Sequence, residues 1–359
     1  MVNCCVVLAI LFSSTILSMH PKRQLEICPG RNAYILQSFA QKSDKKEPTP
    51  CVFCDENVLA KNYILGEDYE HDLRWMMNLH RYFNQGKHLL VMPISHVEHP
   101  DEFFRNQLKN FADKAQELCA KLSVTAYSQE YVTHWGKIAG QSVAHWHSHL
   151  KNYEEQPLSL SEKMKRDRNE QVVTIEEVFR LTKEQLKSVS YIPALLQQIT
   201  KSTCECHCCL MMNNQEEHED NLIVAQFEHN YVCLSNYPCL PAELAVVPKR
   251  HVSSMKDLSQ DEFREHVVVT MALLPKVREY AQNFIRNCDG GILYTKNIGD
   301  RASIDEQKQY HVHTIVAPRT EIPITLGTLE GHSCKLDFDP GHFFQYLKNK
   351  HDELSAIVK

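Results

Sequence analysis

The chain carries an internal repeat, and this repeat limits its architecture more than any other feature. Cys51 and Cys54 form a Cys-x-x-Cys pair that is followed by an apolar run ending at His96. The run CHCC at 206–209 is followed by a similar run ending at His251. In both stretches the histidine lies 42 residues after the last cysteine, and the two windows align without a gap. The spacing predicts one structural unit that is present twice in the chain.

Each window continues into the same order of expected elements. Apolar residues at three-and-four spacing predict helices over 106–122 and 264–284, although Pro275 should bend or interrupt the second. A short strand-like stretch follows each helix, and then a histidine-rich strand at 145–150 or 311–316. The sequence therefore predicts an α+β fold in which an antiparallel sheet with a covering helix is made twice.

The repeat divides the chain into five segments. Residues 1–50 form an N-terminal extension and linker, 51–150 the first repeat, 151–200 a helix-prone connector, 201–320 the second repeat, and 321–359 a segment with a final amphipathic helix. The first twenty residues are apolar and uncharged, but they lack the basic start of a signal peptide. A cleaved signal, a membrane anchor and a plain extension all remain open for this part.

Composition excludes some classes of protein. A net charge of −6 with no dominating basic block argues against a groove for a polynucleotide, although a small nucleotide needs only a local pocket. The 14 cysteines and 20 histidines indicate metal, disulfide or redox chemistry. Because the cysteine and histidine spacings recur together, metal is favoured over a secreted disulfide protein. Thiolate metal sites suit a reducing compartment, so the cytoplasm is expected, with export through the N-terminal segment as the alternative.

The stretch AHWHSHL at 144–150 places three histidines on alternate positions. In a strand, His145, His147 and His149 would share one face, about 7 Å from neighbour to neighbour. A solvated polar face is the plain alternative. The first two histidines recur as His311 and His313, which favours a functional row.

Together with the paired cysteines, the stretches HLLVMPISH and GQSVAHWHSHL resemble the histidine triad (HIT) superfamily of nucleotide hydrolases and transferases. The likeness covers 51–150 well and 206–319 more loosely. The duplication is similar to that of galactose-1-phosphate uridylyltransferases and dinucleoside polyphosphate phosphorylases. The resemblance implies two HIT-like repeats and a nucleotide as the small-molecule partner.

The paired cysteines predict metal sites. A tetrahedral zinc needs two ligands besides a Cys-x-x-Cys pair, and the repeat supplies His96 and His145 to Cys51 and Cys54. In the second repeat the same roles fall to Cys206, Cys209, His251 and His311. Members of the superfamily that keep the cysteines resemble this in holding a closed structural zinc, so one zinc per repeat is expected. The alternative is that the cysteines are buried or reactive thiols.

If a metal occupies His145, His147 is the free imidazole at the centre of the row. A neutral imidazole is a competent nucleophile when an acceptor holds its other nitrogen. The resemblance implies that His147 attacks an α-phosphorus and forms a nucleotidyl-histidine intermediate. It also implies that His149 interacts with the phosphate or the leaving group, with a merely packed histidine as the alternative.

The resemblance also nominates residues that contact the substrate. The positions that match are His88, His134, Gln141, Ser142, His80 and Asn78. His134 stands where relatives carry Asn or Gln near the phosphate, and His80 stands where relatives hold the ribose with Asp or Asn. These two departures leave the ribose contact open.

The second repeat departs further from the pattern. Glu243 stands in place of His88 and Ile315 in place of His149, and an insertion puts Glu306, Gln307 and Lys308 where the first repeat has Gly-Gln-Ser. A carboxylate facing a phosphate repels it in a poorly solvated site. The second repeat is therefore expected to keep its metal and to lack catalysis.

The resemblance implies water as the acceptor, hence a nucleotide hydrolase, because the hydrolytic branches carry His at the third place of the row, as His149 is here, whereas the uridylyltransferase and phosphorylase branches carry Gln. Two alternatives stay open: a nucleotidyltransferase or phosphorylase with another acceptor, and a zinc-stabilised scaffold that binds nucleotide without turnover. The substrate would be a nucleoside phosphate conjugate, such as a dinucleoside polyphosphate, a nucleotide sugar or a phosphoramidate. A homodimer is allowed, and membrane contact is expected only if the first segment is an anchor.

Overall fold

The computed structural model describes most of the chain after the extension. The described residues are 51–59, 63–78, 86–103, 105–126, 128–137, 139, 141–153, 175–191, 206–213, 222–234, 242–283, 290–298, 311–319 and 340–358. The expectations about residues 1–50, about His80 and about the insertion at Glu306, Gln307 and Lys308 lie outside these residues.

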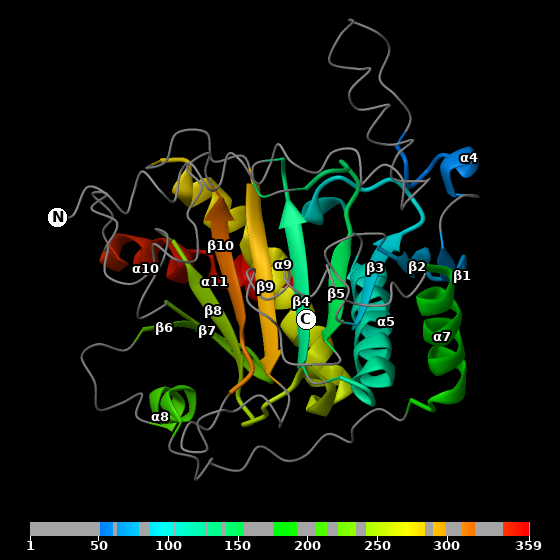
Figure 1. The fold of residues 1–359 in the computed structure, drawn as a ribbon. Helices are drawn as coiled ribbons and strands as arrows, with labels where there is room; N and C mark the ends of the chain where they lie inside the picture. The colour runs from blue at the N-terminus through cyan, green and yellow to red at the C-terminus, as the bar shows by residue number, and fades with distance from the viewer. Residues whose placement is uncertain are drawn as a thin grey trace, which may run out of the picture.

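Ten antiparallel strands form one sheet through the middle of the molecule (Figure 1). The first repeat contributes β1 Ile64–Asp68, β2 Leu73–Met77, β3 Gly86–Pro93, β4 Ser128–Trp135 and β5 Ser148–Tyr153. The second contributes β6 Ile223–Gln226, β7 Asn230–Leu234, β8 Leu244–Pro248, β9 Gly290–Ile298 and β10 Thr314–Arg319. The strand order is β1-β2-β3-β5-β4-β9-β10-β8-β7-β6, so each half has the same order when it is read from its own edge.

The two halves join through their innermost strands. β4 and β9 pair from Ser128 opposite Ile298 to Trp135 opposite Gly291. The predicted α+β fold of two similar repeats is confirmed. The sequence did not indicate that the sheets of the two repeats are continuous, as this pairing shows. Joining the halves in this way pairs two edges that would otherwise be open.

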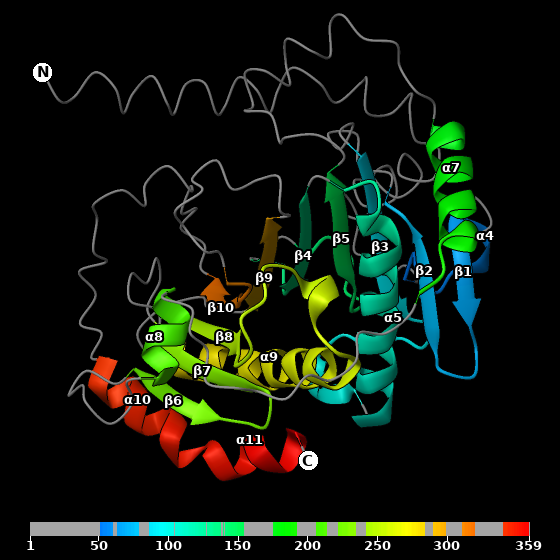
Figure 2. The same ribbon diagram turned by 90° about the horizontal axis from the view of Figure 1, so that it is seen from below.

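Two long helices cover one face of the sheet (Figure 2). They are α5 Arg105–Ser123 and α9 Gln260–Ala281, which confirms the two helices predicted over 106–122 and 264–284. They pack against each other as well as against the strands, and Arg264 donates two hydrogen bonds to the Asp113 carboxylate across that contact, both 2.6 Å long. The helix side of the sheet therefore holds one core that is shared by both repeats.

Pro275 does not interrupt the second helix, because α9 continues through it, and the alternative of a bend stays a prediction. The proline lacks one backbone donor, but the helix is held at its start by a capping box between Ser259 and Glu262. Its buried face then packs along most of its length. Tertiary packing thus outweighs the loss of one hydrogen bond.

Shorter helices complete the fold. They are α4 Glu56–Leu59, α7 Ile175–Ser188, α8 His207–Asn213, α10 Pro340–Asn349, α11 His351–Val358 and the 3-10 turns η1 Pro100–Glu102 and η2 Met255–Asp257. The helix predicted in the connector is present as α7, whereas the C-terminal helix is divided at Lys350. No helix within the described ranges is both long and apolar enough to cross a bilayer.

The other face of the sheet carries a small apolar cluster in each repeat. Along β3, Leu89 and Val91 face the helix-side core, whereas Leu90 and Met92 belong to a cluster with Phe53 of the first Cys-x-x-Cys. The corresponding second cluster includes Tyr231 and Val247. The paired cysteines of each repeat therefore lie on the face opposite to α5 and α9.

The predicted histidine-rich strands begin later than expected. β5 starts at Ser148 and β10 at Thr314, so His145 and His147 precede the first of these strands. The stretch before β5 makes irregular hydrogen bonds instead of a ladder: the His145 N–H donates to the nearby Val143 carbonyl, and the Trp146 N–H donates to the Val97 carbonyl, which is distant in sequence. Side chains still alternate there, because the Trp146 ring packs in the helix-side core against Phe103.

Candidate active site and metal centres

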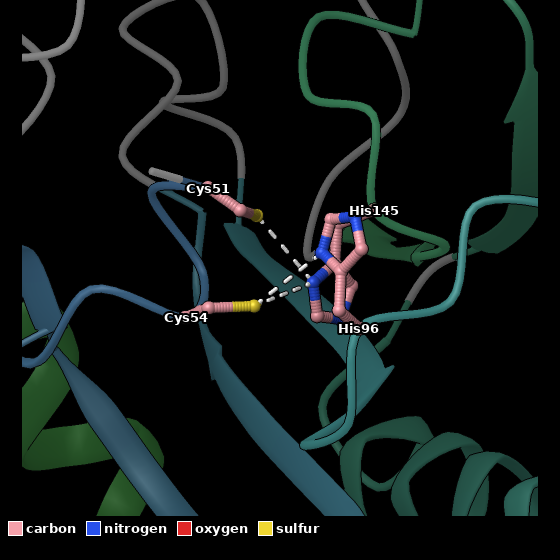
Figure 3. Close-up of side chains that lie close together, drawn as sticks. All are labelled: Cys51, Cys54, His96 and His145. Carbon is pink, nitrogen blue, oxygen red and sulfur yellow. Dashed lines mark hydrogen bonds between the residues drawn. The ribbon is translucent and has the colours of Figure 1, made fainter. Parts of the chain in front are cut away.

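The first four predicted metal ligands lie together (Figure 3). The His145 Nδ1 atom is 3.5 Å from the Cys51 sulfur and 3.4 Å from the Cys54 sulfur. The His96 Nδ1 atom is 3.5 Å from the Cys54 sulfur. All four ligand atoms lie within 4.8 Å of one another. Residues from three separate parts of the first repeat therefore converge on one point.

These distances fit a tetrahedral metal ion. Zinc bonds of about 2.3 Å to sulfur and about 2.0 Å to nitrogen, at the tetrahedral angle, place the two ligand atoms about 3.5 Å apart. The His145 Nε2–H also donates to the Pro93 carbonyl at 2.9 Å, which leaves its Nδ1 lone pair directed at the cysteines. Two sulfurs and two imidazole nitrogens form a donor set suited to zinc, so the residues fit the metal.

The second set repeats this geometry. The His251 Nδ1 atom lies 3.4 Å from the Cys206 sulfur and 3.6 Å from the Cys209 sulfur, and the His311 Nδ1 atom lies at the same two distances. The His311 Nε2–H donates to the Pro248 carbonyl at 2.9 Å, as His145 does to Pro93. Each repeat thus brings together a cluster that can hold one metal ion.

Burial keeps two ligands of the first centre, Cys51 and His145, neutral when no metal is bound. It raises the pKa of the Cys51 thiol to about 12 and lowers the pKa of His145 to about 4. A neutral imidazole is ready to bind a metal, whereas the thiol must first lose its proton. Binding of a metal ion here therefore releases protons from the cysteines.

The Cys-x-x-Cys turn is tied to the sheet by a buried arginine. The Cys54 N–H donates to the Cys51 carbonyl at 2.9 Å and closes the turn. Arg74 on β2 donates from Nη1 to the Phe53 carbonyl at 2.8 Å, and its Nε–H donates to Glu67 at 2.6 Å. The arginine therefore joins the turn to β1 and β2.

Asp72 holds the turn that carries His96. It lies in the β1–β2 connection with φ of 56°, a left-handed conformation that Asp and Asn tolerate. Its carboxylate accepts from the Ser95 N–H at 2.7 Å, from the Ser95 hydroxyl, and from the Gln107 side-chain amide at 3.0 Å. Three donors therefore fix the residue immediately before a metal ligand.

We expect Asp72→Asn to weaken metal binding at the first centre about tenfold, which is the usual size of an outer-shell effect. Asn keeps the backbone conformation but has one acceptor oxygen, so its amide group would face the Ser95 hydroxyl or Gln107 donors. Competition with a chromogenic chelator measures the affinity. Asp68→Asn is the matched control, since Asp68 contacts only the exposed His71 in this turn. Equal affinities in the two variants would contradict this role.

His147 is buried beside the first centre. Its Nδ1–H donates to the His145 carbonyl at 2.7 Å, and because a carbonyl only accepts, Nε2 must carry the lone pair of the neutral ring. The Phe53 ring lies edge-on to it, with 5.3 Å between centroids. Burial lowers the pKa of His147, so the ring is neutral at pH 7. This is the state that can act as a nitrogen nucleophile.

Three further imidazoles lie on the same face. The His149 ring is 5.0 Å from the His147 ring, 5.2 Å from the His88 ring and 5.4 Å from the His134 ring. His149 Nδ1 is 3.0 Å from His88 Nε2, and the Asn78 side-chain amide nitrogen is within 3.4 Å of both atoms. Burial, together with the neighbouring His147, His88 and His134, places the pKa of His149 well below its usual value.

The turn after β4 is held by Gln141. Its Oε1 accepts from the Gly136 N–H at 2.7 Å, and its Nε2–H donates to the His145 carbonyl at 3.2 Å. Gly136 has φ of 83°, a conformation that favours glycine. The predicted phosphate contact of Gln141 stays a prediction, but its carboxamide is engaged within the turn. Ser142 is exposed at the end of this turn.

The second repeat holds one imidazole in the same way but surrounds it differently. The His313 Nδ1–H donates to the His311 carbonyl at 2.9 Å, which matches the bond of His147. Ile315 on β10 takes the place that His149 has on β5. Each lies between the two neighbouring strands of its repeat, Ile315 opposite Ala245 and Tyr294, and His149 opposite Leu90 and Val132. Glu243 is buried just before β8. At the positions that match His149 and His88, the second repeat therefore carries Ile315 and Glu243 instead of imidazoles.

Comparison with protein families agrees with this geometry. Residues 79–152 match the HIT domain model. Over these residues the chain is similar to the HIT domain. The HIT domain match ends within β5, two residues beyond the expected boundary at 150. A search of curated proteins found no significant match to the chain.

Solved structures share the fold over most of the chain. An ADP-glucose phosphorylase from Arabidopsis thaliana with bound ADP-glucose is 14% identical, with 86% of this chain and 92% of that chain covered and a TM-score of 0.55. A uridylyltransferase mutant is 17% identical, with coverage of 80% and 90% and a TM-score of 0.51. A GalT-like protein from Arabidopsis thaliana is 14% identical, with coverage of 77% and 83% and a TM-score of 0.50. At these identities the likeness concerns the fold alone, and it supports an α+β architecture of two similar repeats.

Sequence reasoning missed three supporting residues. Phe53 could have been noticed, because it lies inside the Cys-x-x-Cys motif and is large and apolar. Arg74 and Asp72 carried no signal, since neither belongs to a motif. Their contacts depend on how β1, β2 and the turn before His96 come together.

Proposed function

We propose that the protein is a HIT-type nucleotide hydrolase that acts at an α-phosphate through a nucleotidyl-His147 intermediate. The substrate is a nucleoside phosphate conjugate, such as a dinucleoside polyphosphate, a nucleotide sugar or a phosphoramidate. One observation carries the proposal: the His145 carbonyl holds the Nδ1–H of His147 at 2.7 Å, so that the lone pair lies on Nε2 of a buried, neutral ring.

The reaction consists of two displacements at one phosphorus. His147 Nε2 forms a bond to the α-phosphorus while the bond from phosphorus to the leaving group breaks and that group departs with the electron pair. Water then attacks the same phosphorus, the bond to His147 breaks, and the nucleoside monophosphate is released with one proton. The proposal assigns hydrogen-bond donation to the phosphate or the leaving group to Ser142 and to His149, whose ring centroid is 5.0 Å from that of His147.

We infer that each metal cluster holds one structural zinc ion. When bound, the ion crosslinks the Cys-x-x-Cys turn to two histidines and leaves no open coordination position for chemistry. In the first repeat this fixes His145, whose carbonyl holds His147, and it fixes the turn that carries Phe53 against the His147 ring. The first centre therefore positions the nucleophile, while the second maintains the fold of its own repeat.

A phosphorylase or nucleotidyltransferase is the second candidate. The observation in its favour is the match in length and repeat organisation to the ADP-glucose phosphorylase, of which 92% is covered. In that case inorganic phosphate or another anion takes the place of water in the second displacement. The partner is a small nucleotide in both cases. The cytoplasmic location and the homodimer remain predictions.

Product analysis with α-phosphate-labelled ADP-glucose, UDP-glucose and diadenosine tetraphosphate tests these alternatives, using the zinc-replete full chain with and without inorganic phosphate. The hydrolase gives AMP or UMP whether phosphate is present or not. A phosphorylase gives ADP or UDP only when phosphate is present. Binding of these nucleotides without product and without acid-labile label on the protein supports the scaffold and overturns the proposal.

A further inference from the structure

His147 lies between two residues whose side chains enter the core on the helix side of the sheet. Trp146 belongs to that core, and so does Leu150, which shares a face of β5 with Ser148. Apolar packing holds Trp146 there, with its ring centroid 5.8 Å from that of Phe103. Ser148 is fully buried, and a buried hydroxyl requires hydrogen-bond partners. The two chain neighbours of His147 are therefore held by different forces.

Two side chains of β4 supply the partners of Ser148. The Tyr131 hydroxyl donates to Ser148 Oγ at 3.0 Å. Thr133 Oγ1 is 2.6 Å from Ser148 Oγ, so that one of these two hydroxyls donates to the other. All three side chains are buried, and burial raises the pKa of Tyr131, so the phenol keeps the proton that it donates. Three hydroxyls thus form one buried network across the β4–β5 pair.

The place of this network along β5 decides what it holds. The pairing of β4 with β5 runs from Ser128 opposite Tyr153 to Thr133 opposite Ser148, and it ends there. His147 lies one residue beyond this last pair, where the backbone no longer makes ladder hydrogen bonds. The network therefore fixes the chain at the last paired residue before the proposed nucleophile, on the face opposite to the imidazole.

We propose that Ser148 is a positioning residue for His147, because its hydrogen bonds to β4 fix the backbone that directs Nε2 at the phosphorus. The inference rests on the proposed function for the role of His147. A displacement at phosphorus needs the attacking atom in line with the leaving group, and a misplacement of about 1 Å lowers the rate by as much as about 100-fold. Packing of Trp146 and hydrogen bonding of Ser148 together determine this placement.

The second repeat offers a matched comparison. Thr314 takes the place of Ser148, one residue after His313, and it is also buried. Its hydroxyl lies 2.7 Å from His266 Nε2 on α9, so here the bond runs from the sheet to a helix. The His266 Nδ1–H donates to the Asn230 side-chain oxygen at 2.8 Å, so Nε2 accepts from Thr314. Both hydroxyls hold a buried partner, but only Ser148 lies beside the proposed nucleophile.

Ser148→Ala and Thr314→Val are compared in the zinc-replete full chain. Both remove a buried hydroxyl and leave its partner unpaired, so both should lower the unfolding midpoint. Ser148→Ala should also lower kcat about 10- to 100-fold with KM within about twofold of the wild type, and slow single-turnover labelling of His147 by the same factor. Thr314→Val should keep kcat within about twofold. Unchanged kcat in Ser148→Ala, or equal losses in both variants, overturns the inference.

A triple variant separates positioning from stability. Tyr131→Phe, Thr133→Val and Ser148→Ala together replace the three hydroxyls by apolar groups, so that none is left buried without a partner and much of the lost stability should return. We expect kcat to stay low, because no side-chain hydrogen bond then ties β5 to β4 at this point. Recovery of kcat along with the unfolding midpoint would mean that the network serves stability alone, and it overturns the inference.

A measurement without turnover keeps this inference separable from the proposed function. Nitrogen NMR of the histidine rings should show a protonated Nδ1 and an unprotonated Nε2 for His147 in the wild type, because the His145 carbonyl accepts from Nδ1. In Ser148→Ala the two signals should move toward each other as that bond loosens, whereas Thr314→Val should leave them unchanged. Absence of label on wild-type His147, with this NMR change present, removes the proposed function alone. Unchanged signals in Ser148→Ala remove the inference alone.

Discussion

His147→Ala should abolish both turnover and acid-labile labelling by an α-phosphate-labelled nucleotide, with a fall in kcat of at least about 10³-fold. The variant removes the Nε2 lone pair that the His145 carbonyl keeps available. His147→Gly with added imidazole should recover part of the turnover, because free imidazole can occupy the same place. Such recovery separates lost chemistry from lost folding.

His313→Ala is the sharpest control for this experiment. The chain holds the two imidazoles in the same way, through a Nδ1–H bond to the carbonyl two residues earlier, at 2.7 Å for His147 and 2.9 Å for His313. They differ in their surroundings, since Ile315 replaces His149 and Glu243 replaces His88. We expect His313→Ala to keep more than half of the wild-type turnover. An equally large loss in both variants would mean that catalysis is shared between the repeats.

Cys54→Ser should reduce the zinc content from two ions to one per chain and lower the unfolding midpoint by roughly 10 °C, since a structural zinc contributes folding free energy directly. It should also remove turnover in the fraction that stays folded. The reason is that the Cys-x-x-Cys turn places the Phe53 ring against the His147 ring, while the backbone carbonyl of His145 accepts the hydrogen bond from His147 Nδ1. Loss of the metal would loosen both contacts of the nucleophile. Elemental analysis, thermal unfolding and product assays measure the three effects.

Cys209→Ser provides the comparison from the second repeat. It should lose one zinc and a similar part of the thermal stability, but the folded fraction should keep its turnover. Cys119→Ala is the control for loss of a cysteine outside the clusters, because Cys119 is buried in α5. Its zinc content should remain two per chain. Zinc content unchanged in Cys54→Ser would argue against the first centre.

The outline of the candidate site could be predicted from the spacing of a few residue types. Each cluster contains its four expected ligands, because the second repeat preserves between Cys209 and His251 the interval that separates Cys54 from His96. The helices after each window were also predictable from their apolar periodicity. The prediction of a strand over 145–150 is wrong for its first residues, since the alternation of side chains is visible in the sequence while the partner strand is not.

The sequence by itself determined the repeat, the metal-binding residue types and the central histidine, because these depend on residue identity and on intervals along the chain. The tertiary structure decided that the two sheets are continuous through β4 and β9, and that Arg74 and Asp72 support the first metal centre. It also decided that His134 donates from Nδ1 to the Ala139 carbonyl. Strand pairing and hydrogen-bond partners join residues that are distant along the chain or lie in irregular turns, so only the folded backbone sets which atoms meet and which nitrogen carries a proton.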